Sequence, residues 1–111
     1  MRTFDEQAIV SIAPNANAVS NGRKLSSGNS FVKRMKSADD SLYFGECKGS
    51  GKSNYNVSID FEKEGEPVFR CSCPSRQFPC KHAIGLMFEM KEGKSFEQLR
   101  FLRISWIREK R

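Results

Sequence analysis

The sequence predicts a small α+β fold in which an antiparallel sheet of about three strands leads into a helix, with short flanking helices at both ends. One observation is the strict alternation of apolar and polar residues over 55–61, which is typical of a half-buried strand. Another is the helical spacing of apolar residues over 83–90. The third is size, because 111 residues with 38% hydrophobic content suit one domain with a thin core.

Residues 1–40 are predicted to be a helical and loop segment that packs on the rest of the domain. A Thr3-x-x-Glu6 capping box predicts a helix over about 4–12, which Pro14 ends. Asn15 is expected to cap a second short helix that stops at Asn21-Gly22. The Ser/Gly-rich residues after it predict a loop, followed by one more helical turn that begins at Phe31.

Residues 41–93 are predicted to hold the sheet and the main helix. Strands are expected over 42–47, 55–61 and 68–71, in an antiparallel meander joined by polar, Gly-rich turns. The helix that follows is expected to stop at Gly93. The predicted core comprises Leu42, Phe44, Tyr55, Val57, Ile59, Phe61, Ala83, Leu86, Met87 and Met90.

Residues 94–111 are predicted to form a basic C-terminal helix, helical over 96–109, with an imperfect apolar stripe. No apolar stretch approaches the roughly 20 residues that a membrane-spanning helix requires. The first residues are polar and acidic where a signal peptide has its apolar run. These features predict a cytoplasmic protein.

The segment that carries chemistry holds three cysteines, Cys71, Cys73 and Cys80, followed by the only histidine, His82. A dense Cys/His cluster in a reducing compartment indicates a metal site, and three sulfurs with one imidazole suit tetrahedral zinc. Residues i and i+2 of a strand point to one side, so Cys71 and Cys73 can present both sulfurs together. The same spacing on a helix places side chains about 200° apart, so Cys80 is expected in the extended turn before the helix and His82 in its first turn. A metal-free core of buried thiols is the alternative interpretation.

Four protein ligands close the coordination sphere, which marks a structural zinc site and predicts that the protein is not an enzyme. Catalytic zinc needs an open position and a nearby base, whereas Glu89 lies two turns beyond His82 and no H-x-E pattern occurs. A thiol oxidoreductase would need C-x-x-C rather than C-x-C. Cys47 has no place in this pattern and is expected to be a half-buried strand residue, with a redox or regulatory thiol as the other reading.

The order of strands, C-x-C, loop, C-x-H and helix resembles the SWIM zinc finger of bacterial proteins, over about residues 42–90. The resemblance implies that Cys71, Cys73, Cys80 and His82 bind Zn²⁺, and that residues 41–93 are the finger. It also implies binding to DNA or to other proteins. SWIM fingers commonly belong to longer proteins, so the chain is alternatively the N-terminal part of one.

Charge favours nucleic acid as the partner. The net charge is +6, of which residues 71–111 carry +5, from nine Lys/Arg and four Asp/Glu. The candidate contacts are Arg76, Lys81, Lys91, Lys94, Arg100 and Arg103. The alternative is a zinc-stabilised adaptor for a protein partner, which the apolar stripe of the last helix supports.

Overall fold

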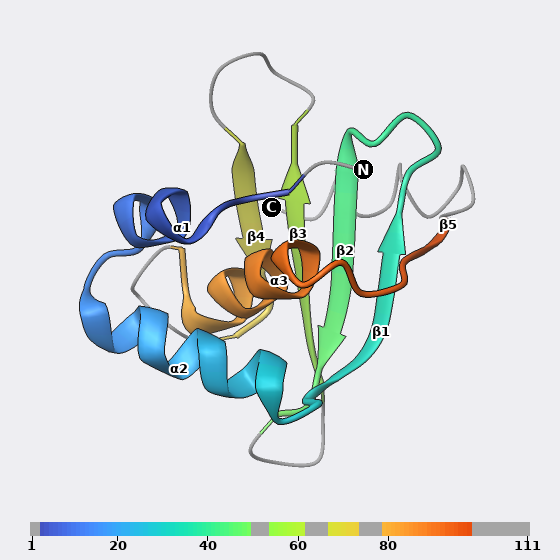
Figure 1. The fold of residues 1–111 in the computed structure, drawn as a ribbon. Coiled ribbons are helices and arrows are strands. Elements are labelled where there is room, and N and C mark those ends of the chain that lie inside the picture. Colours follow the sequence, from blue (N-terminus) through green and yellow to red (C-terminus); the bar gives the residue numbers. More distant parts are fainter. Residues whose placement is uncertain (1–2, 50–53, 62–66, 74–78, 99–111) are drawn as a thin grey trace.

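A computed structural model describes residues 3–49, 54–61, 67–73 and 79–98 (Figure 1). The α+β class is confirmed. In chain order the elements are α1 (Glu6–Ile12), α2 (Ala16–Ser27), β1 (Phe31–Lys36), β2 (Leu42–Cys47), β3 (Tyr55–Asp60), β4 (Val68–Cys71), α3 (Lys81–Lys91) and β5 (Glu97–Gln98).

The strands form one mixed sheet in the order β4-β3-β2-β1-β5. The predicted meander of β2, β3 and β4 is confirmed, with Tyr43 opposite Ile59 and Ile59 opposite Phe69. The predicted number of about three strands is wrong, because the described residues form a sheet of five. The additional strands are β1, which pairs antiparallel with β2, and β5, which pairs in parallel with β1.

Strand β1 occupies the position where a helical turn was expected. Its two buried apolar residues, Phe31 and Met35, are four apart, which is also the spacing of one helix face. A β-bulge between Phe31 and Lys33 places the two residues on opposite faces of the sheet, because one extra residue reverses the face on which later side chains lie. Phe31 accordingly belongs to the main core, and Met35 packs with Leu42 and Phe44 in a second cluster.

Helix α3 is the middle layer of the molecule. It packs against β2, β3 and β4 on one side, while α1 and α2 pack against it on the other (Figure 1). Every residue of α3 from His82 to Met90 is buried. A helix covered on all sides needs apolar residues around most of its circumference, and the sequence of α3 provides them.

The N-terminal helices differ from the prediction in their caps and lengths. Helix α1 is capped by Asp5 instead of Thr3, through a 2.7 Å hydrogen bond from the Ala8 amide to Asp5 Oδ1. The prediction that Asn15 caps α2 is confirmed, but the helix continues past Gly22 to Ser27. Gly22 is a packing residue rather than a stop, because a Cβ there would lie 2.6 Å from Ile84 Cγ2 of α3.

The C-terminal end of α3 agrees with the prediction, and the segment after it does not. Gly93 has φ 69°, a left-handed conformation that ends helices, as expected. The expected helix over residues 96–109 is wrong at residues 96–98, because Phe96 is in no helix and Glu97 and Gln98 form β5. The rest of that predicted helix lies outside the described residues.

Most of the predicted core is buried: only Tyr55 and Phe61 of the ten residues are half-exposed. Prediction missed further buried residues of this core, namely Phe4, Ile9, Ala18, Val19, Phe31, Tyr43, Ile84 and Phe88. Among the described helices, none has the length and hydropathy needed to cross a membrane.

Candidate metal centre

The four predicted ligands come from the end of β4 and the start of α3. Cys71 is the last residue of β4, and Cys73 follows two residues later. The Ser72 amide donates to the Asn56 carbonyl at 3.0 Å and the Asn56 amide donates to Ser72 Oγ at 2.9 Å. These two bonds hold the chain beside β3 past the end of β4, so the segment between the two cysteines is fixed in place.

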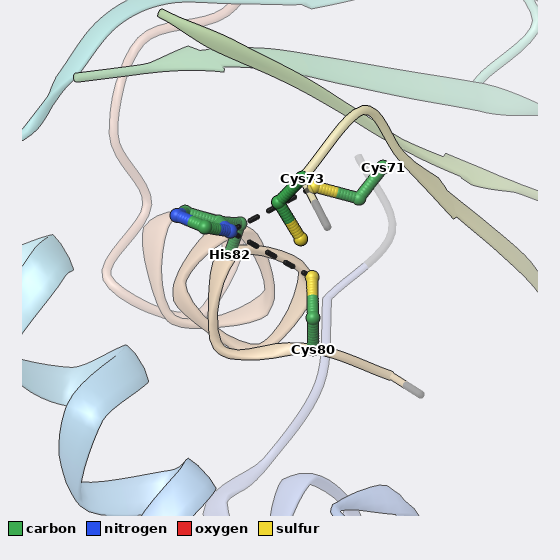
Figure 2. Close-up of side chains that lie close together, drawn as sticks. All are labelled: Cys71, Cys73, Cys80 and His82. Atoms are coloured by element: carbon green, nitrogen blue, oxygen red, sulfur yellow. Dashed lines mark hydrogen bonds between the residues drawn. The ribbon is translucent and has the colours of Figure 1, made fainter. Parts of the chain in front are cut away.

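Cys80 and His82 lie where the spacing argument placed them. Cys80 is the N-cap of α3 with an extended backbone, φ −75° and ψ 173°. Its carbonyl accepts the first helical hydrogen bond, from the Ile84 amide at 3.1 Å. His82 is the second residue of the helix, so its imidazole is directed back over the first turn, towards Cys80 and the end of β4 (Figure 2).

The donor atoms are arranged closely enough for one metal ion (Figure 2). His82 Nδ1 lies 3.7 Å from Cys71 Sγ and 3.8 Å from Cys80 Sγ. One donor atom from each of the four residues lies within 4.8 Å of the others. Zinc with bonds of about 2.3 Å to sulfur and 2.0–2.1 Å to nitrogen would need S–N edges of about 3.6 Å and S–S edges of about 3.8 Å. The cluster therefore fits a tetrahedral zinc ion with little adjustment, and Nδ1 is the imidazole nitrogen that faces it.

The centre favours thiolate at one sulfur in particular. The pKa of Cys80 is lowered, chiefly because Cys71 hydrogen-bonds to its sulfur, with smaller contributions from His82 and the nearby Ala83 amide. The pKa of Cys71 is raised, chiefly because its thiol is the partner in that hydrogen bond. The free amides at the start of α3 also favour negative charge at this position. Without metal, the pair therefore shares a proton that zinc must displace.

Cys47 lies outside the cluster. It is fully buried in β2, rather than half-buried as expected, and belongs to the main core. Burial raises the pKa of its thiol to about 11. A buried thiol of this kind packs as a small apolar group.

The predicted nucleic-acid contacts fall into three groups. Lys81 and Lys91 are exposed at the two ends of α3. Lys94 is partly buried, with Nζ 2.6 Å from Glu89 Oε2 and 2.9 Å from the Ser26 carbonyl oxygen. The other predicted contacts, Arg76, Arg100 and Arg103, lie outside the described residues.

Sequence reasoning missed the role of Glu89, which has no exposed side-chain surface. Its Oε1 accepts from Arg34 Nη1 at 3.1 Å, and its Oε2 pairs with Lys94 and accepts from Ser26 Oγ. This network joins α3 to α2, β1 and the segment after α3. Its only sequence signal was a carboxylate among the apolar residues of the helix, which is costly to bury unless it is paired.

Sequence reasoning also missed the contact between Tyr55 and His82, whose ring centroids are 4.8 Å apart with an interplanar angle of 49°. The alternation of β3 placed Tyr55 in the core, and nothing in the spacing linked it to the histidine. The contact exists because β3 lies beside β4, the strand that leads into the cluster.

Comparison with known families agrees with the geometry. The family model of the SWIM zinc finger matches residues 55–91, from the first residue of β3 to the last residue of α3. The match covers about a third of the chain and includes all four clustered residues. No curated protein and no solved structure shows significant similarity to the chain. Residues 55–91 therefore match the SWIM zinc finger, and the Cys/His cluster that they carry could hold its zinc ion.

Proposed function

We propose that the chain is a non-catalytic zinc module in which Cys71, Cys73, Cys80 and His82 bind one Zn²⁺ and whose partner is nucleic acid. The observation that carries the ligand set is the convergence of these four donors, with S–N distances of 3.7 and 3.8 Å that match a tetrahedral edge. Three sulfurs and one nitrogen fill the coordination sphere. No position is then left for a substrate or a reactive water, which supports a structural role for the metal.

The ligands tie the end of β4 to the first turn of α3. Among the described residues between Cys71 and Cys80, no helix or strand joins β4 to α3. Cys80 caps α3 without a side-chain hydrogen bond to the helix. Zinc when bound supplies that connection, and its binding energy becomes folding energy for residues 71–91. Residues 41–93 are proposed as the finger, with 1–40 packing on it and 94–111 as a basic extension. A centre that needs free thiolates suits the reducing cytoplasm.

Nucleic acid is the partner that the charge supports best. Residues 71–111 carry a net charge of +5, whereas residues 1–70 carry +1. Lys81 is exposed directly beside the cluster. The nearby Arg70 forms an ion pair with Asp60, with Nη1 3.0 Å from Oδ2. In the described part of the finger, Lys81 is therefore the cation next to the cluster whose side chain is exposed. Each phosphate that such a cation neutralises releases a counterion and steepens the salt dependence of binding.

Titration of a fluorescent DNA duplex with the zinc-loaded protein tests this partner. Binding at low salt should weaken strongly between about 50 and 200 mM salt. Lys81→Glu should weaken binding and reduce the salt slope by about one. Lys48→Glu is the matched control, because Lys48 is also exposed and the change in net charge is the same, but it lies after β2, outside the finger's metal centre. Equal effects of the two variants would show that only net charge matters.

The second candidate is a zinc-stabilised adaptor for a protein. The apolar residues of the predicted C-terminal segment, Leu99, Phe101, Leu102 and Trp106, favour it. No measurable affinity for DNA or RNA at low salt would remove the first candidate and leave this one.

A further inference from the structure

We propose that Tyr55 is a positioning residue of the metal centre, whose ring holds the His82 imidazole with Nδ1 turned towards the sulfurs. This inference rests on the ligand set proposed above. It adds a residue that contributes no ligand atom and comes from a different strand from the cysteines.

The sheet register places Tyr55 beside the metal ligands. Val57 is opposite Cys71 in the β3–β4 pair, and Asn56 exchanges two hydrogen bonds with Ser72. These bonds keep the chain beside β3 for one residue past the last strand pair. Side chains of directly opposite residues lie on one face of a sheet, and so do residues two apart on a strand. Tyr55 thus lies on the face that carries the cysteines and is covered by α3.

The tyrosine ring packs on the imidazole from this position. The two ring centroids are 4.8 Å apart and the planes are inclined by 49°. His82 is only 4% exposed, so the ring has little solvent around it into which it could turn. Tyr55 is half-buried at the first residue of β3, a strand held on both sides by β2 and β4. A ring anchored on a paired strand can restrict the rotation of a histidine on the first helical turn.

Packing by Tyr55 orients the His82 ring because the hydrogen-bond contacts of that ring to other described residues are at one nitrogen, Nδ1. Histidine ligands are usually oriented by a hydrogen bond from the ring nitrogen that does not bind the metal. Both side-chain hydrogen-bond contacts of His82 to other described residues are at Nδ1, the nitrogen that faces the sulfurs. Contact with Tyr55 therefore supplies the orientation that a second hydrogen bond gives in other zinc sites. Its hydroxyl is not required for this, so Phe should replace Tyr.

Competition with a chromogenic chelator tests the proposal by measuring the zinc affinity of the wild type, Tyr55→Ala and Tyr55→Phe. Tyr55→Ala should weaken zinc binding roughly 10- to 100-fold, the usual effect of losing a group that orients a ligand. Tyr55→Phe should retain wild-type affinity. Phe61→Ala is the matched control, because Phe61 is also a half-buried aromatic residue adjoining β3, and its ring packs against Phe4 and Tyr43.

Long-range proton–nitrogen NMR of the imidazole gives a readout that stability alone does not change. The wild type and Tyr55→Phe should show a single His82 state with zinc on Nδ1 and a proton on Nε2. Tyr55→Ala should show more than one ring state or a weakened Nδ1–zinc signature, and Phe61→Ala should keep the wild-type pattern.

The outcomes separate this inference from the proposed function. If wild type binds one zinc and Tyr55→Ala binds it equally well, with an unchanged imidazole spectrum, the positioning role is overturned and the ligand set stands. Equal loss of affinity in Tyr55→Ala and Phe61→Ala, with unchanged spectra, also overturns it, since general destabilisation then explains the loss. If the wild type binds no zinc, both proposals fail.

Discussion

Replacing Gly22 by Ala tests how closely α2 must pack against α3, the helix that carries His82. A Cβ at this position would lie 2.6 Å from Ile84 Cγ2, 2.9 Å from Ile84 Cβ and 3.0 Å from the Gly85 amide nitrogen. Carbon atoms in contact prefer about 3.5–4.0 Å. Because Ile84 Cβ and the Gly85 backbone are fixed parts of α3, a side-chain rotation cannot relieve the overlap, and the two helices must separate.

The expected cost is the difference between two effects. Overpacking of a well-packed core costs about 1–3 kcal/mol. Ala in place of Gly inside a helix recovers about 1 kcal/mol of helix propensity. Ile84 is fully buried and β-branched, so its side chain has little freedom to adapt, and the cost should lie in the upper part of the range. We expect a net loss of about 1–2 kcal/mol, and a fall in Tm of roughly 5–10 °C.

Denaturant unfolding of the zinc-loaded protein, followed by circular dichroism, measures this loss. Asn21→Ala is the control, because Asn21 is exposed on the same helix, where Ala should be neutral or stabilising by a few tenths of a kcal/mol. Neighbouring substitutions to Ala should therefore have opposite signs. A Gly22→Ala protein as stable as the wild type would refute the close helix contact.

Three further predictions concern buried charge, buried thiol and proton release. Glu89→Gln should lower the free energy of unfolding by about 2–4 kcal/mol, because Arg34 and Lys94 lose their buried partner; a loss under about 0.5 kcal/mol, measured by denaturant unfolding, would contradict this. Cys47, with its pKa raised to about 11, should stay unreactive towards a thiol reagent at pH 8 in the zinc-loaded protein, and all four cysteines should react after chelation and unfolding; fast labelling of Cys47 in the native protein would argue against its burial. Zinc binding at pH 7 should release about two protons instead of three, because the lowered pKa of Cys80 leaves that thiol already ionised, and zinc affinity should fall as the pH falls; calorimetry in buffers of different ionisation enthalpy counts the protons, and release of three would show that Cys80 is protonated beforehand.

The sequence predicted the elements whose local patterns are unbroken. Strand β3 alternates cleanly, and α3 carries apolar residues at helical spacing up to a glycine that ends it. The spacing of the cysteines and the histidine was sufficient to predict that the four metal-binding candidates lie close together, as they do. An i, i+2 pair on a strand or at the start of a helix has only a few possible geometries.

The remaining features depend on contacts between distant segments. A bulge hides the period of β1, and β5 is a two-residue pairing that leaves no pattern of its own. Gly22 looked like a helix stop because its packing partner, Ile84, is 62 positions away in the sequence. The contact of Tyr55 with His82 likewise depends on sheet register, which alternation alone does not reveal.

In the proposed centre, three sulfurs and one imidazole nitrogen surround a single zinc ion and join the sheet to α3. Zinc X-ray absorption of the purified protein, combined with metal quantification, tests it most directly. We expect one zinc per chain, with three sulfur neighbours at about 2.3 Å and one nitrogen neighbour at about 2.0 Å. A shell of oxygen and nitrogen alone, fewer than three sulfurs, or substantially less than one zinc per folded chain would contradict it.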